Sequence, residues 1–327
     1  MLTDSTSIVP ATTTAPTGWI ELHKLIEESE QFRRAARSER TWKAYRSDLR
    51  SFAGWADQHG VSALPATPET VVAYITTSAS KYRPATIRRH LAAISVAHKL
   101  AGHESPTKHP VVNEVLKGIE RTIGTSQTRK RALTVQEIRR ISRKLPDTKR
   151  GARDRAILLL GVSGALRRSE IVGLDVNDIV FVEAGMVVTL RVSKSDQERA
   201  GVEIGVPYAA HELTCAVRVV KHWLEVASIT EGPVFRGVDR GDRVSDDRLS
   251  ANGVARLVKS ACASIGLDVR KVGGHSLRAS YATIGASAGV SPFSLAEGGR
   301  WKSLDVLQRY VRHANLVKDN PVSSFGF

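Results

Sequence analysis

Six residues in the second half of the chain are of types that can break and remake a phosphate ester. They are Arg167 and Glu170 of an Arg-x-Ser-Glu pattern, His275 and Arg278 of a His-x-x-Arg pattern, and Trp301 and Tyr310, which lie nine residues apart. A phenol oxygen can attack phosphorus and store the bond energy as a phosphotyrosine. Two guanidiniums can each hold two phosphate oxygens, whereas a lysine offers only a point charge. These residue types predict cleavage of a phosphodiester with neither metal nor ATP.

Four of the six candidates would act on the phosphate or the nucleophile. Tyr310 is the predicted nucleophile, although a lone tyrosine in a helical pattern such as LQRYVR is usually a structural residue. We expect Arg167 and Arg278 to hold the nonbridging oxygens, where the transition state gathers charge. His275 lies one helical turn from Arg278, on the same face, and could act as acid, base or phosphate donor.

The other two candidates would support them. Trp301 has only its indole N–H to donate, so it must act by hydrogen bonding or by packing. Glu170 is an anion and does not bind phosphate directly. We expect it to orient Arg167 or His275.

Other enzyme signatures are missing from the sequence. It contains no GxxxxGK[ST], no GxGxxG after a strand, no HExxH and no GxSxG. His211, Cys215 and His222 lie within a short stretch of a predicted amphipathic helix, where we interpret them as packing and surface residues rather than zinc ligands. We therefore expect no metal and no cofactor.

These motifs and a fourth patch, SKSDQERAG, resemble those of the tyrosine recombinase family, the phage integrases and their relatives. The fourth patch is similar to the sheet turn that carries the family's catalytic lysine, here Lys194. The resemblance implies that Lys194 protonates the departing 5′ oxygen. Trp301 takes a position held by His in many members and by Trp in Cre-like ones. The match extends over nearly the whole chain.

From this resemblance we expect a site-specific DNA recombinase, which cuts and rejoins strands through 3′-phosphotyrosyl intermediates and a Holliday junction. Its partners would be double-stranded DNA with an inverted-repeat core site, copies of itself in a tetramer on two sites, and accessory DNA-binding proteins. Two alternatives stay open. Relaxation of supercoils, as in type IB topoisomerases, uses a related set of residues, and an accessory DNA-binding protein could keep the fold without cutting.

The charge balance also indicates a polyanionic partner. The chain has 327 residues, with 48 Lys and Arg against 33 Asp and Glu and a formal net charge of +15. Residues 121–155 carry 12 basic and 3 acidic side chains, so the excess is concentrated in one segment. A charge run is more often a solvated face than a binding site, but this one coincides with the best candidate linker. Nucleic acid is therefore the predicted partner.

The sequence predicts a mainly α fold with a small antiparallel β-sheet, divided into two domains. We expect a flexible tail over 1–18, a helical DNA-binding domain over 19–124, a basic linker over 125–131 and a catalytic domain over 132–327. The resemblance implies that the two domains form a clamp around DNA. The N-terminus lacks a secretory signal and the apolar runs are short, so we expect a cytoplasmic, DNA-bound protein without a membrane span.

Local signals position these elements. Ser38, Pro68 and Pro84 mark helix starts in the first domain, and Thr134 with Glu137 makes a capping-box spacing in the second. Three β-branched runs within 179–208 predict the sheet. The two cysteines sit in no CxxC pair, so we expect buried free thiols.

Basic side chains that lie off the apolar stripes of the helices suit a DNA groove and its flanking phosphates. The candidates in the helical domain are Lys43, Arg46, Arg50, Arg88 and Arg89, and those in the linker are Arg129, Lys130 and Arg131. Taken alone, each is equally well explained as an ordinary solvated side chain.

Overall fold

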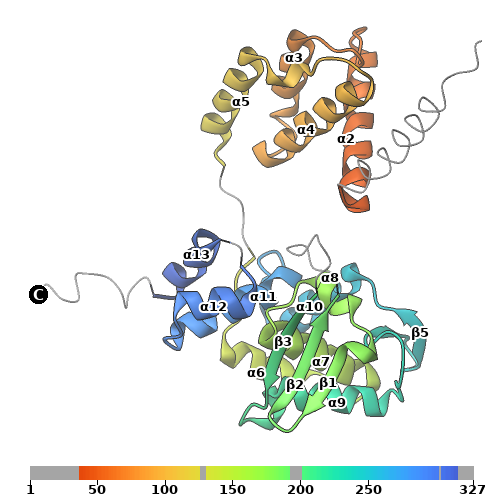
Figure 1. Ribbon diagram of the computed structural model, residues 1–327, viewed down its shortest axis with the longest axis vertical. Coiled ribbons are helices and arrows are strands. Elements are labelled where there is room, and N and C mark those ends of the chain that lie inside the picture. Colours follow the sequence, from red (N-terminus) through yellow and green to blue (C-terminus); the bar gives the residue numbers. More distant parts are fainter. Residues whose placement is uncertain (1–36, 126–129, 192–200, 302, 316–327) are drawn as a thin grey trace, which may run out of the picture. The chain divides into compact units, whose positions relative to one another are not determined.

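The computed structural model describes residues 37–125, 130–191, 201–301 and 303–315. The chain divides into two compact units, Met1–Gln127 and Thr128–Phe327. Both are mainly helical, and the second also contains the strands (Figure 1). The predicted class, mainly α with a small antiparallel sheet, is confirmed.

The described part of the first unit is built from helices. They are α2 (Glu39–Gln58), α3 (Pro68–Ser78), α4 (Pro84–Leu100) and α5 (Pro110–Ile123), with the 3-10 turn η1 (Pro106–Lys108) before α5. The Ser38 hydroxyl caps α2 by accepting from the N–H of Thr41. Proline stands in the first turn of α3 and α4, where its missing N–H leaves no helical bond unmade. The predicted starts at Ser38, Pro68 and Pro84 are confirmed.

The core of this unit lies between the helices. Phe52, Ile75, Ile87, Ile94 and Val112 come from all four of them and are at most 2% exposed. Burying one such side chain contributes about 1.5–3 kcal/mol. The periodic apolar stripes of the sequence therefore face one another in the folded unit.

A buried carboxylate crosses the same core. Asp48 of α2 is 3% exposed and accepts from the Arg89 guanidinium, Nε to Oδ2 at 2.7 Å and Nη2 to Oδ1 at 2.9 Å. The Nε2 atom of His90 lies 3.2 Å from Oδ1, and the Nδ1 atom of His90 lies 2.7 Å from the Tyr74 hydroxyl oxygen. This network joins α2, α3 and α4.

Along the chain, helices of the second unit come before, between and after its strands. They are α6 (Val135–Lys144), α7 (Lys149–Ser163), α8 (Arg168–Gly173), η2 (Val176–Asp178), η3 (Glu212–Thr214), α9 (Ala216–Val226), α10 (Ala251–Ala263), α11 (Gly274–Ser287), α12 (Pro292–Gly299) and α13 (Leu304–Asn315). The capping box of Thr134 and Glu137 is confirmed at the start of α6.

The predicted antiparallel sheet has the strand order β1 (Ile179–Val182), β2 (Gly185–Leu190) and β3 (Val202–Pro207). In its register Val188 lies opposite Ile179 on one side and Ile204 on the other. These three side chains are at most 8% exposed, so one face of the sheet packs on the core. Lys194 belongs to the segment between β2 and β3 that lies outside the described residues.

Two elements of the second unit have weak sequence signals, and we did not predict them. Helix α12 has only eight residues, too few for a periodic stripe, although Ser291 caps it and Pro292 opens it. The second sheet pairs β4 (Arg236–Val238) with β5 (Val244–Arg248). Because β5 reads VSDDR, it lacks the alternation of apolar and polar residues that identifies a strand.

The core of the second unit is continuous from α6 to α11. Trp223 of α9 is fully buried, and its indole N–H donates to the Val234 carbonyl at 2.8 Å. Cys215 and Cys262 are buried and free, as expected. Within the described residues, no helix combines the length and the apolar character that a membrane crossing requires.

We expect Asp48→Ala to destabilise the first unit by about 2 kcal/mol, because the buried His90 ring and the Arg89 guanidinium lose their common partner. Arg89 is half exposed and can turn to solvent, which limits the loss. Amide hydrogen exchange across residues 37–125 measures the effect. Asp57→Ala removes an exposed carboxylate from the same helix and should leave exchange unchanged. Equal protection in both variants would contradict a stabilising role for Asp48.

Candidate functional site

Arg167 and Glu170 open helix α8 and are bound to each other. Arg167 is the N-cap, and its backbone N–H donates to Glu170 Oε2 at 2.9 Å. The Arg167 guanidinium donates through Nη1 to the other carboxylate oxygen, Oε1. The Glu170 side chain is 1% exposed, so this carboxylate holds the guanidinium from inside the protein. Glu170 therefore contacts Arg167, one of the two residues that we expected it to orient.

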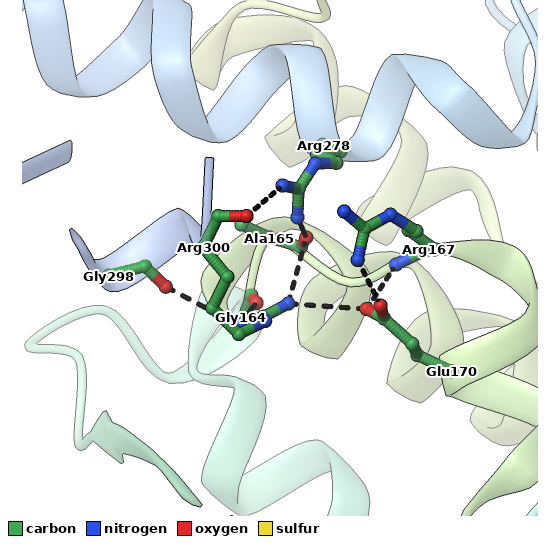
Figure 2. Close-up of polar contacts among 7 residues, drawn as sticks. All are labelled: Gly164, Ala165, Arg167, Glu170, Arg278, Gly298 and Arg300. Atoms are coloured by element: carbon green, nitrogen blue, oxygen red, sulfur yellow. Dashed lines mark hydrogen bonds and ion pairs between the residues drawn. The ribbon is translucent and has the colours of Figure 1, made fainter. Parts of the chain in front are cut away.

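Helix α11 places Arg278 in the same region. Arg278 is 3% exposed and donates through Nη1 to the Ala165 carbonyl at 2.7 Å and through Nη2 to the Arg300 carbonyl at 3.2 Å (Figure 2). Its guanidinium carbon also lies 4.0 Å from the centroid of the Trp301 ring. A cation over an aromatic face is attracted by the ring quadrupole. Two carbonyls and one ring therefore fix the plane of this guanidinium.

Tyr310 on α13 lies against His275 on α11. The Tyr310 hydroxyl oxygen is 3.0 Å from His275 Nε2, which is hydrogen-bond distance. Tyr310 and Trp301 both pack on a small apolar cluster that includes the buried Leu307. Trp301 stacks on Tyr281 with ring centroids 6.2 Å apart. The cluster therefore holds the tyrosine and the tryptophan of the last motif beside α11.

The site carries an excess of positive charge. Burial lowers the pKa of Arg278 from its usual value, and the guanidiniums of Arg167 and Arg300 lower it further, against the opposing effect of Glu170. A lowered pKa means that the charged form is poorly compensated. A phosphate bound beside Arg278 would supply the missing negative charge.

The same surroundings keep His275 neutral. Burial lowers the pKa of His275 from its ordinary value, and Arg278, Arg167 and Arg168 act in the same direction. The residue as a whole keeps contact with solvent. Because the folded state binds the proton less well than the unfolded state, His275 reduces stability as pH falls below 6.5 toward its folded-state pKa. At neutral pH its Nε2 can accept a proton from Tyr310.

Arg300 is a residue of this site that the sequence analysis missed. Its guanidinium donates through Nη2 to Glu170 Oε2 at 3.2 Å, so Glu170 is bound by two arginines (Figure 2). Arg300 also donates to the carbonyls of Gly164 at 3.2 Å and Ala165 at 3.3 Å. Its position next to Trp301 was the one signal that could have indicated it.

The structure brings six predicted residues into this region. They are Arg167, Glu170, His275, Arg278, Trp301 and Tyr310. The seventh, Lys194, lies outside the described residues. The arrangement offers guanidiniums for an anion, a phenol as nucleophile and a neutral imidazole as proton acceptor.

The basic candidates of the helical unit fall into two groups. Lys43 and Arg50 are exposed. Arg46 pairs with Glu39 at 2.5 Å, Arg88 with Glu120 at 2.5 Å and Arg89 with Asp48 at 2.7 Å. The paired arginines would have to share or exchange these carboxylates to reach a phosphate.

The basic linker candidates are also engaged where the structure describes them. The Arg131 guanidinium donates to both carboxylate oxygens of Glu137, at 3.0 and 2.7 Å. The Arg131 backbone N–H donates to the backbone carbonyl of Lys271 at 2.8 Å. The Lys130 ammonium donates to the Arg270 carbonyl at 2.5 Å. Both residues are therefore fastened to the second unit, whereas the sequence analysis placed them in a linker. Arg129 lies outside the described residues.

We expect Arg168→Gln to raise the pKa of His275, because it removes one of the positive charges that disfavour the imidazolium. An NMR titration of the imidazole measures this directly. Arg50→Gln removes the same charge from the first unit and should leave the titration unchanged. An identical His275 pKa in the wild type and in Arg168→Gln would show that neighbouring guanidiniums do not set it.

Sequence comparison covers both units. The model of the phage integrase family matches residues 131–316, and that of the phage integrase N-terminal SAM-like domain matches residues 31–105. An integrase/recombinase xerD homolog of Selenomonas ruminantium is 35% identical over 292 residues, which is 88% of this chain and 86% of the relative. The recombinase cre of Escherichia phage P1 is 26% identical over 301 residues, 86% of each chain.

A solved structure has the same fold. A lambda integrase tetramer bound to a Holliday junction matches with a TM-score of 0.56 at 18% identity, covering 88% of this chain and 76% of that one. The family match spans more than half of the chain and includes every residue of the site. The protein therefore belongs to the phage integrase family, the tyrosine recombinases.

Proposed function

We propose that this protein is a site-specific DNA recombinase that cuts and rejoins strands through a covalent bond between Tyr310 and a DNA 3′ phosphate. The observation that carries the proposal is the hydroxyl of Tyr310 at 3.0 Å from His275 Nε2, beside two guanidiniums anchored by Glu170 and by backbone carbonyls. A phenol, a proton acceptor and an anion clamp in one place suit attack on a phosphodiester.

In the cleavage step the Tyr310 oxygen attacks phosphorus while its proton passes to His275 Nε2. The bond from tyrosine oxygen to phosphorus forms as the bond from phosphorus to the 5′ oxygen breaks, and the 5′ oxygen takes a proton. Lys194 is the proposed donor of that proton. Rejoining is the reverse step, in which a 5′ hydroxyl attacks the phosphotyrosine, so no external energy source is consumed.

Arg167 and Arg278 would stabilise the charge that gathers on the nonbridging oxygens. Each guanidinium is held from behind, Arg167 by Glu170 and Arg278 by the carbonyls of Ala165 and Arg300. Their geometry is set before the phosphate arrives, so no reorganisation is needed during the reaction. Trp301 contributes its ring face against Arg278.

The proposed partners are double-stranded DNA with an inverted-repeat core site and further copies of this chain. The lambda integrase with the same fold is a tetramer on a Holliday junction, and we propose the same assembly on two sites here, with or without accessory DNA-binding proteins. The exposed Lys43 and Arg50 and the net charge of +15 suit contacts with the DNA backbone. The proposed place of action is the cytoplasm, on DNA.

We expect Tyr310→Phe to bind DNA as the wild type does and to form no covalent complex, since the ring keeps its packing and loses only the nucleophile. A nicked suicide substrate on a denaturing gel measures the trapped complex. A covalent adduct with the Phe variant would show that another residue attacks. Wild-type exchange between two core sites, without relaxation of supercoiled DNA that lacks the site, would separate a recombinase from a topoisomerase.

We expect Arg167→Lys to slow cleavage by roughly 10²–10³-fold, because a lysine keeps the charge but loses the paired N–H groups that hold two oxygens. The matched control is Arg168→Lys at the neighbouring position, which keeps the charge near His275 and should cleave normally. Single-turnover cleavage of the suicide substrate gives both rates. Equal rates for the two variants would remove Arg167 from the phosphate clamp.

A further inference from the structure

Arg300 links two parts of the site that are far apart in the sequence. It follows α12 and precedes Trp301, on the segment that leads to Tyr310. Its guanidinium contacts Gly164 and Ala165 in the loop before α8 and Glu170 in the first turn of α8 (Figure 2). These contacts span 130 or more positions of the chain. The segment that carries the tyrosine is thereby fastened to the loop that carries Arg167.

The backbone is strained at both ends of this link, and hydrogen bonds hold it in that conformation. Arg300 has φ 59° and Ala165 has φ 50°, a left-handed conformation that is unfavourable for residues other than glycine. Arg300 directly precedes Trp301, and Ala165 lies two positions before Arg167. The strained pair is bridged twice, by Arg300 Nη2 on the Ala165 carbonyl and by Arg278 on both carbonyls.

The burial of the Arg300 guanidinium is also costly. Its side chain is 9% exposed, and its Nε has no hydrogen-bond partner among the residues that the structure describes. Burial lowers the pKa of Arg300, while Glu170 opposes that shift. A glycine at this position would satisfy the left-handed backbone with neither of these penalties. Stability of the turn alone therefore does not explain an arginine here.

We propose that Arg300 is a positioning residue for DNA cleavage. Its guanidinium binds Glu170 on the side opposite to the Arg167 guanidinium and thereby fixes the position of Arg167. Its contacts with the loop before α8 also fix the turn that places Trp301 against Arg278. It acts through these residues and does not itself contact the phosphate. This role rests on the proposed function, because it concerns the same reaction.

The test compares Arg300→Gly with wild type in two measurements on DNA. Glycine keeps the left-handed turn and removes the guanidinium, so we expect normal binding of a half-site in a gel shift. We expect single-turnover cleavage of a suicide substrate to fall by roughly 10²-fold, as displacement of a clamp residue by about an ångström does. Arg300→Lys, which can still pair with Glu170, should recover part of the rate. Cleavage by Arg300→Gly at the wild-type rate would overturn the proposal.

A double variant tests whether Arg300 works through Glu170. If it does, Glu170→Gln added to Arg300→Gly should lower the rate by much less than the product of the two single losses. Losses that multiply would mean that the two residues act independently, and equal losses in binding and cleavage would mean that Arg300 contacts DNA. Either result would overturn the positioning role.

A third measurement does not depend on activity. Hydrogen exchange at the Arg167 amide, which donates to Glu170, should accelerate in Arg300→Gly. The matched control is Ser228→Gly, which changes another residue with positive φ, 52°, at the end of α9. Unchanged exchange at the Arg167 amide in Arg300→Gly would contradict the link from Arg300 through Glu170 to Arg167, even if wild type proved unable to cleave DNA. If exchange accelerated in Arg300→Gly and wild type did not cleave DNA, only the proposed function would be contradicted.

Discussion

The buried carboxylate of Glu170 is the interaction on which the arrangement of the site depends. Two guanidiniums, those of Arg167 and Arg300, share its oxygens, and a third, Arg278, lies beside them. One negative charge among three positive ones leaves the region electropositive. Because these groups are largely buried from water, each charge carries a desolvation cost in free energy. Backbone carbonyls lower that cost by accepting hydrogen bonds from the guanidinium N–H groups of Arg278 and Arg300. The uncompensated charge is what an incoming phosphate would neutralise.

The packing of three guanidiniums around Glu170 constrains the backbone and the small residues nearby. The chain is left-handed at Ala165 and Arg300, the two residues whose carbonyls accept from Arg278. The elements also approach closely, since a Cβ added to Gly274 would lie 2.1 Å from Arg168 Cδ and one added to Gly299 would lie 1.6 Å from the Trp301 ring. Larger side chains there would push Arg168 or Trp301 out of place.

The sequence predicted what local chemistry determines and missed what distant contacts determine. Ser38, Pro68 and Pro84 act within one turn of their helices, so their effect could be read directly. The site motifs could be identified because their order and separations resemble those of the tyrosine recombinases, and their residue types suit one chemistry. Arg300 could not, since its contacts with Gly164, Ala165 and Glu170 join positions 130 or more apart and its left-handed backbone contradicts the propensity of arginine. The β4–β5 hairpin was missed for a similar reason, because pairing rather than alternating polarity defines it.

The helical unit shows why charge counts alone do not identify contacts with DNA. Arg88 and Arg89 are adjacent and both bind carboxylates, but their partners differ in burial. The Glu120 side chain is 14% exposed and can turn to solvent if a phosphate takes Arg88. The Asp48 side chain is only 4% exposed, so it would be left charged inside the core if Arg89 moved away. Exposed ion pairs are weak and exchangeable, and buried ones are costly to break. The burial of the partner, which composition does not reveal, therefore makes Arg88 available to a phosphate and commits Arg89 to the fold.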